Sequence, residues 1–354
     1  MRFFQAIAPV AVLANVAIAH GNHDIQQEVK QRRDFLTTQR RTNLAHCADK
    51  LKARGVDKRN VARRAAGVEQ ARAKKNLKTK RTEDSVLATD HNKTSLGYTE
   101  NTEVAALFAD YNSCLLTPQV TQGPYYVADE YVRRNIGEDL EGVPIVMDFQ
   151  VVDINTCEPM PNTYLEIWHA NSTGVYSGVD VEGNGSGESD PGNLDKTWGR
   201  GIQETNADGV AQFESIVPGH YTGRAIHIHT VVHKNATLYS NSTLGAESVT
   251  SHIGQVFLDQ DLISLVEATY PYNTNEQDLT LNADDTILAT ETETDGVDPF
   301  MEYVMLGDSI EDGVFAWVSF GVNATYTKVM DPVVYLTADG GVDNPNWDDA
   351  DGRP

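Results

Sequence analysis

Short apolar runs separated by turn residues dominate the chain from about Cys114 onward. The runs are rich in β-branched and aromatic residues, and Gly, Pro, Asn and Asp stand between them, which is typical of strands and turns. Many such strands in succession predict a mainly β fold, a β-sandwich. The predicted strands cover residues 143–152, 163–168, 210–216, 225–232, 255–258 and 315–322.

The pattern that precedes these strands is helical. Apolar side chains recur at helical spacing over residues 24–54, and Gly55 is placed to end that helix. Asp57 begins a second stretch, so residues 20–81 predict a helical hairpin with a thin apolar face that needs a packing partner. The mixed polar residues 82–107 predict a linker, residues 108–337 form the sandwich domain, and the acidic residues 338–354 predict a flexible tail.

The first 19 residues predict a secretory signal peptide. Arg2 precedes an apolar run, and Ala17-Ile18-Ala19 provides the small-x-small cleavage pattern. No other long apolar run occurs, so we expect a secreted protein whose mature form has no membrane span. Six N-x-[ST] sequons agree with export, at Asn92, Asn171, Asn184, Asn235, Asn241 and Asn323. An oxidising compartment lets two of the three cysteines pair, and the sequence does not choose among Cys47, Cys114 and Cys157.

The chain has a net charge of -23, and its basic and acidic residues are concentrated in different segments. Residues 20–81 hold 18 Lys and Arg against 6 Asp and Glu, whereas residues 82–354 hold 9 against 45. A body this acidic repels nucleic acid, so we expect no nucleic-acid partner. The basic segment has two interpretations: it docks on the acidic body or on a second subunit, or it is a pro-segment that ends at the dibasic pair Lys80-Arg81.

A pair of histidines carries the candidate chemistry. His227 and His229 stand two apart in a predicted strand, so both imidazoles point to one face. Neutral imidazole suits iron, copper or zinc. No Asp or Glu stands in that strand near the pair, but Tyr221 and Tyr176 precede it. Because free tyrosine titrates near pH 10, phenolate ligands need a strongly Lewis-acidic cation, and ferric iron matches them. An isolated H-x-H pair is as often a pair of surface or core histidines as a metal site, and a tyrosine taken alone is more often a packed aromatic.

Residues 115–325 resemble the intradiol ring-cleaving dioxygenases, the class of catechol 1,2-dioxygenase and protocatechuate 3,4-dioxygenase. Within this family, the sequence pattern is most similar to that of the secreted fungal members. Gln122 departs from the family pattern, where an acidic residue is common. The motifs that carry the resemblance occur in the family's order at residues 117–126, 166–171, 174–177 and 218–229.

The resemblance implies an Fe(III) enzyme that uses O2 to cleave a catechol-type aromatic diol between its two hydroxyl-bearing carbons, giving a muconate-type diacid. It implies that Tyr221 is axial and leaves the metal when substrate arrives. It places Arg224 over the substrate, with Gln255 in support. The implied metal ligands are Tyr176, Tyr221, His227 and His229, and the implied pocket residues are Thr121, Pro124 and Tyr125.

Two alternatives stay open at this stage. One is a secreted β-sandwich binding module that has kept the fold without iron. The other is a cupin-like oxygenase, which would need a carboxylate ligand near the histidine pair. The sequence does not fix which aromatic diol is the substrate. It allows a homodimer but does not determine the oligomeric state.

Overall fold

The structure is a computed structural model that describes residues 26, 29–30, 33–34, 44–77, 123–181, 183–185, 190–245, 249–292 and 297–347. The predicted signal peptide, the predicted linker, Cys114 and Thr121 therefore lie outside the described residues. In the part that is described, no helix is both long and apolar enough to cross a bilayer.

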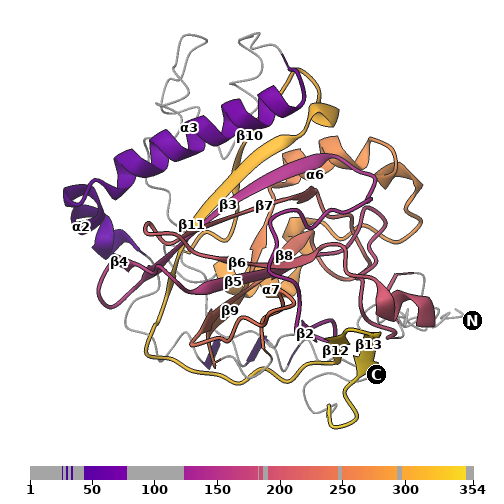
Figure 1. Ribbon diagram of the computed structural model, residues 1–354. Helices are drawn as coiled ribbons and strands as arrows, with labels where there is room; N and C mark the ends of the chain where they lie inside the picture. The colour runs from indigo at the N-terminus through magenta and orange to yellow at the C-terminus, as the bar shows by residue number, and fades with distance from the viewer. Residues whose placement is uncertain are drawn as a thin grey trace, which may run out of the picture.

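Two β-sheets packed face to face form the body (Figure 1), which confirms the mainly β fold. In the first sheet, β11 runs parallel to β3 and the other pairs are antiparallel. Its strands are β3 (Pro144–Asp153), β4 (Glu158–Pro159), β7 (Val210–Ile216), β10 (Glu302–Met305) and β11 (Val314–Val322). The second sheet is antiparallel, with the order β6-β5-β8-β9. Its strands are β5 (Tyr164–Trp168), β6 (Arg200–Glu204), β8 (His227–Lys234) and β9 (Val249–Phe257).

The second sheet has one apolar face and one polar face. Leu165 and Ile167 of β5 enter the core between the sheets, together with Ile228 and Val232 of β8. Because side chains alternate along a strand, the intervening residues point to the opposite face. That face carries most of the buried polar residues of this sheet: Glu166, Arg200, His227, His229, His233 and Gln255.

A small third sheet and two helices cover the ends of the sandwich. The sheet has the order β13-β12-β2, with β2 (Val127–Ala128), β12 (Val334–Thr337) and β13 (Gly340–Asp343). The helices α6 (Gln260–Glu267) and α7 (Thr286–Thr292) follow β9. The described residues also form short 3-10 helices: η1 (Ala45–Cys47), η3 (Pro191–Asp195), η4 (Tyr272–Thr274), η5 (Asn282–Asp284) and η6 (Ile310–Asp312).

The prediction of a flexible tail from residue 338 is wrong for residues 338–347. Gly340–Asp343 pair with β12, and Trp347 is buried in the cluster beneath the third sheet. The acidic, Gly-rich composition concealed this strand, because its stability comes from pairing and from one aromatic anchor. The pattern also missed β6 and β10, which are short and interrupted by polar residues.

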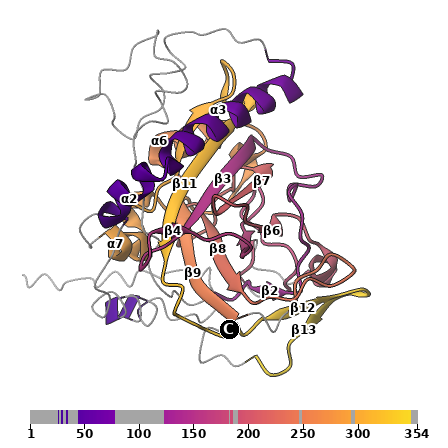
Figure 2. The same ribbon diagram turned by 60° about the vertical axis from the view of Figure 1, so that its left-hand side comes forward.

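The N-terminal helices α2 (Ala48–Ala53) and α3 (Val56–Lys74) are separated at Gly55, as the sequence predicts. Gly55 adopts φ +64°, a left-handed conformation that glycine reaches without strain. Helix α3 lies across the outer face of the first sheet, over β3 and β11 (Figures 1 and 2). The segment 44–77 is therefore docked on the body in this structure.

Apolar and polar contacts both hold α3 on the sheet: the predicted stripe Val61, Ala65 and Val68 packs in one cluster with Phe315 and Trp317, and buried ion pairs lie beside it. Asp148 of β3 is fully buried and accepts hydrogen bonds from Arg63 at 2.9 and 3.0 Å and from Arg64 at 3.2 Å. Burial alone would raise the pKa of Asp148, but the two guanidinium groups hold that pKa below its ordinary value. Arg64 also lies over the ring of Trp317, 5.7 Å from its centroid.

A disulfide joins the same segment to the body. Cys47, just before α2, is bonded to Cys157 in the turn between β3 and β4, which is the pairing that the sequence left open. Around it, Leu44, Leu51 and Val56 pack against Val152 and Ile154. The segment is thus held by a covalent bond at one end and by buried ion pairs along α3.

We expect Asp148→Asn to lower the free energy of unfolding by about 3–5 kcal/mol at pH 7, because it leaves Arg64 buried without its counter-charge. Since the folded pKa of Asp148 is lowered, its stabilisation is present above its unfolded value of about 3.9 and is lost as pH falls through the folded value. Denaturant unfolding at pH 7 and below pH 4 measures both effects. The control Arg59→Ala removes an exposed ion pair to Asp208 and should cost at most about 1 kcal/mol. An equal loss in both variants would contradict a dominant role for Asp148.

Candidate metal centre

Four buried donor atoms from three segments converge on the polar face of the second sheet. Tyr176 comes from the loop after β5, Tyr221 from the turn before β8, and His227 and His229 from β8 itself. His227 Nε2 lies 3.4 Å from Tyr176 Oη, 3.3 Å from Tyr221 Oη and 3.1 Å from His229 Nε2. Neighbouring ligands bonded to one metal at about 2.1 Å would lie roughly 3.0–3.4 Å apart. The spacing of the four atoms therefore fits a single metal ion.

The hydrogen bonds of the histidines suit metal binding. His227 Nδ1 lies 2.7 Å from the carbonyl oxygen of Ala225 and donates its proton there, so Nε2 presents a lone pair to the other three donors. The ring of His229 stacks on Trp168, with centroids 4.6 Å apart and planes at 4°. This stacking follows from the pairing of β5 with β8, in which Trp168 lies opposite His229.

The two phenols need a cation to ionise here. Burial raises the pKa of Tyr176 to about 12, although Tyr221, Arg224 and Arg200 oppose the rise. Burial also raises the pKa of Tyr221 well above its ordinary value. Among the described residues, no third His, Cys, Asp or Glu places a ligand atom within 4.8 Å of the two histidine nitrogens. The donor set is therefore two phenols and two imidazoles, which fits a hard trivalent cation.

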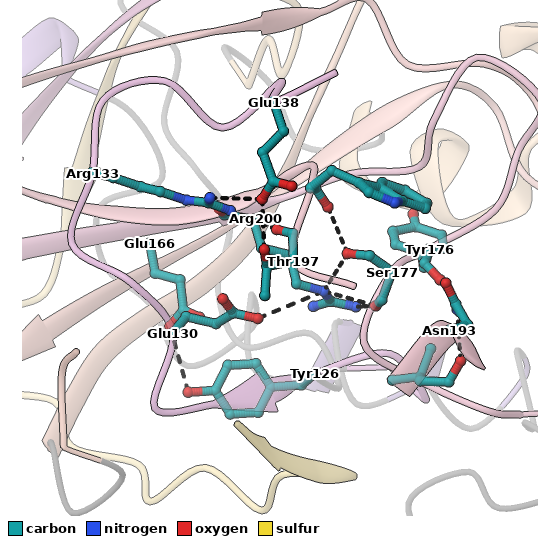
Figure 3. Close-up of polar contacts among 12 residues, drawn as sticks. Tyr126, Glu130, Arg133, Glu138, Glu166, Tyr176, Ser177, Asn193, Thr197 and Arg200 are labelled. Carbon is teal, nitrogen blue, oxygen red and sulfur yellow. Dashed lines mark hydrogen bonds and ion pairs between the residues drawn. The ribbon is translucent and has the colours of Figure 1, made fainter. Parts of the chain in front are cut away.

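Two asparagines clamp the backbone of Tyr176. Asn184 accepts from the Tyr176 N–H at 2.7 Å and donates to the Tyr176 carbonyl at 2.7 Å. Asn193 donates to the same carbonyl at 2.6 Å (Figure 3). Both asparagines are buried. They belong to residues 178–195, a stretch whose Gly- and acid-rich composition is typical of a solvated loop. Part of this stretch instead folds back and fixes a candidate ligand.

Arg200 supports the same segment from below (Figure 3). Its Nε and Nη2 donate to the Ser177 carbonyl at 2.9 and 2.6 Å, and its Nε lies 3.8 Å from Glu130. Burial raises the pKa of Glu130 to about 8, against the attraction of Arg200. Farther along this face, Glu166 pairs with His233. These residues were not identified from the sequence, because each is bound to a partner distant in the chain.

Arg224 lies beside the ligands and is buried. Its Nη2 donates to Gln255 Oε1 at 2.6 Å, and its Nε donates to Asp285 Oδ2 at 2.9 Å. Gln255 faces His229 across the β8–β9 pair, so the structure brings the two predicted substrate residues together. Asp285 was missed, although its position before a helical stretch marks it as a helix cap.

The pocket residues predicted from the resemblance are only partly described. Pro124 is buried, and Tyr125 stacks on Tyr176 with centroids 4.6 Å apart and planes at 16°. Two other histidines have structural partners: His169 contacts Ser215, and His220 pairs with Glu267. The side chain of His252 lies outside the described residues.

Comparisons with known proteins agree with this geometry. A family model described as "Dioxygenase" matches residues 118–261, a range that contains the four donors, Arg224 and Gln255. Catechol 1,2-dioxygenase of Acinetobacter baylyi is 38% identical over 72 residues, which is 19% of this chain and 23% of that protein. Catechol 1,2-dioxygenase 1 of Acinetobacter lwoffii is 34% identical over 110 residues, covering 30% and 32% of the two chains. Each match thus spans a third or less of its relative's length.

Among solved structures, an intradiol ring-cleavage dioxygenase from Tetranychus urticae shows 28% identity and a TM-score of 0.48, covering 61% of this chain and 99% of that chain. The family model and the curated relatives agree with the resemblance seen in the motifs: residues 118–261 match the dioxygenase model, and the chain is similar to catechol 1,2-dioxygenases over part of its length.

We expect Asn184→Ala to weaken metal binding about 10- to 100-fold, since it releases the backbone of a ligand residue. Competition between the protein and a chelator for ferric iron measures the change. Asn346→Ala, at an exposed asparagine near the C-terminus, is the matched control and should leave the affinity unchanged. Equal affinities in the two variants would show that the clamp does not position Tyr176.

Proposed function

We propose that the protein is a secreted non-haem Fe(III) dioxygenase that inserts both atoms of O2 into a catechol-type diol and cleaves the ring between the two hydroxyl-bearing carbons. The product is a muconate-type diacid. The observation that carries the proposal is that the donor atoms of Tyr176, Tyr221 and His229 all lie within 3.4 Å of His227 Nε2. The match of residues 118–261 to the dioxygenase family model supports the same reaction class.

Ferric iron would be held by Tyr176, Tyr221, His227 and His229. When bound, it supplies a Lewis acid that lowers the pKa of the substrate hydroxyls and draws electron density from the ring. The stacked rings of Trp168 and Tyr125 cover the donors and keep water away from them.

Tyr221 is the residue best placed to take a substrate proton. It lies on the turn that precedes β8 rather than within a strand, so its side chain can move without disturbing the sheet. Its raised pKa means that, once freed from a cation, the Tyr221 oxygen holds a proton at neutral pH. As a phenolate, the Tyr221 oxygen would therefore serve as a base toward a catechol hydroxyl.

Arg224 stabilises the negative charge that develops on the substrate. Its guanidinium is buried beside the donors and is held by Gln255 and Asp285. Because the guanidinium is buried away from bulk water, a fixed cation has a large electrostatic effect there.

The alternatives account for fewer of these observations. A binding module without iron gives no reason for four donors to meet in a buried place. A cupin-like site would require a carboxylate beside the histidines, and none lies there among the described residues.

Purified protein should contain one iron per chain, show a red-brown tyrosinate-to-iron absorption band and consume O2 with catechol. Tyr176→Phe and His227→Ala should lose both the band and the uptake of O2. Tyr303→Phe changes a buried tyrosine in the opposite sheet and is the matched control that should retain both. Full uptake in Tyr176→Phe would overturn the ligand assignment, and a colourless wild type without uptake would favour the binding module.

Secretion is supported by the predicted signal peptide and by the places of the sequons. Asn235 and Asn241 are exposed on the connection between β8 and β9. Asn184, in contrast, is buried against Tyr176, so its sequon is not accessible to a glycosyltransferase in the folded protein.

We expect the mature protein to begin at His20 and to carry glycans at Asn235 and Asn241 but not at Asn184. N-terminal sequencing and mass spectrometry of peptides from the culture medium test this. A single start at Thr82 would show that the basic segment is a discarded pro-segment, and a protein retained in cells with Met1 intact would contradict secretion.

A further inference from the structure

Arg224 is held by a carboxylate that belongs to no motif of the family resemblance. We propose that Asp285 is a positioning residue for the dioxygenase reaction: it fixes the Arg224 guanidinium beside the metal centre and ties it to the N-terminus of α7. This inference rests on the function proposed above and adds a residue to it.

One oxygen of Asp285 holds the segment that leads into β8. Asp285 Oδ2 accepts from Arg224 Nε at 2.9 Å and from the Ala225 N–H at 2.7 Å. The side chains of Arg224 and Asp285 are 3% and 0% exposed. A single buried oxygen thus fixes both the guanidinium and the backbone next to it, two residues before the first histidine.

The other oxygen holds the start of α7. Asp285 Oδ1 accepts from the N–H groups of Ile287 and Leu288 at 2.8 and 2.9 Å. Since each oxygen has two donors, the carboxylate cannot turn without breaking hydrogen bonds. Leu288 in turn packs against Ala225, so the helix and the turn are joined by an apolar contact as well.

Gln255 completes the support from the opposite side. It accepts from Arg224 Nη2 at 2.6 Å and belongs to β9, whereas Asp285 precedes α7. The planar guanidinium is therefore held at two edges by two different elements. A cation held in this way needs little reorganisation when charge develops on a substrate, and displacing it by about 1 Å can cost on the order of 100-fold in rate.

Asp285 also allows Arg224 to be buried as a cation. An unpaired guanidinium would be unstable in this place, and the carboxylate supplies its counter-charge. The same two residues thus account for both the charge and its orientation beside the donors.

Asp285→Asn is the informative variant, because Asn remains a good helix cap but removes the counter-charge. We expect kcat for O2 uptake with catechol to fall about 10- to 100-fold, with KM within about threefold. Iron content and the visible band should not change. Asp259→Asn is the matched control: Asp259 caps α6 by accepting from Leu262 N–H at 2.7 Å, and its variant should keep the wild-type kcat.

A double-mutant cycle with Arg224→Met separates positioning from general destabilisation. Once Arg224 is gone, Asp285→Asn should cause no further loss in kcat. This double variant also removes the stranded charge, so it tests the proposal even where Asp285→Asn alone fails to fold. Equal losses with and without Arg224, a kcat within twofold of wild type, or loss of the iron band would each overturn the proposal.

Failure of the proposed function gives a different result. An iron-loaded wild type that consumes no O2 with catechol would contradict the dioxygenase proposal itself. The wild type, the two single variants Asp285→Asn and Arg224→Met, and the double variant would then be titrated with 4-nitrocatechol. Non-additive changes in its Kd would still support the coupling of Asp285 to Arg224, and additive changes would overturn it.

Discussion

Strand β8 has to satisfy two environments at once, and the rest of the site depends on this. Ile228 and Val232 enter the core between the sheets, while His227 and His229 point to the polar face. Because the pleat fixes this alternation, the imidazoles cannot turn away without pulling apolar side chains out of the core. The packing of the sandwich therefore makes the candidate metal centre rigid.

The buried polar face brings a second requirement, that each polar group has a hydrogen-bond or charge partner, since an unsatisfied buried polar group costs about 1–3 kcal/mol. Most of this face meets it with partners from the protein: Glu166 pairs with His233, and Arg200 donates to the Ser177 carbonyl. At the four converging donors, however, three face the lone pair of His227 Nε2. A cation bound among them would contact all four donor atoms at once, so this is the part of the face where the protein gathers ligand atoms around one point.

Local periodicity and turn residues were enough to predict the β-sandwich, the break at Gly55 and the shared face of His227 and His229. They could not predict Asn184 or Asp285, because each holds backbone groups through tertiary contacts that have no period in the sequence. The strand at 340–343 was missed for a related reason: its pairing partner, and not its own composition, makes it a strand. The features that the sequence predicted depend on neighbouring residues, whereas the residues that position the candidate ligands depend on contacts between distant parts of the chain.

The bond between Cys47 and Cys157 changes the covalent topology of the molecule, since these cysteines are 110 residues apart. Residues 47 to 157 form a closed ring through the disulfide. A protease that cuts once anywhere within that ring, including after Arg81, converts one chain into two but separates nothing. Helix α3 would stay attached until a reductant also acted, so proteolytic nicking and release of the basic segment are two distinct chemical events in this protein.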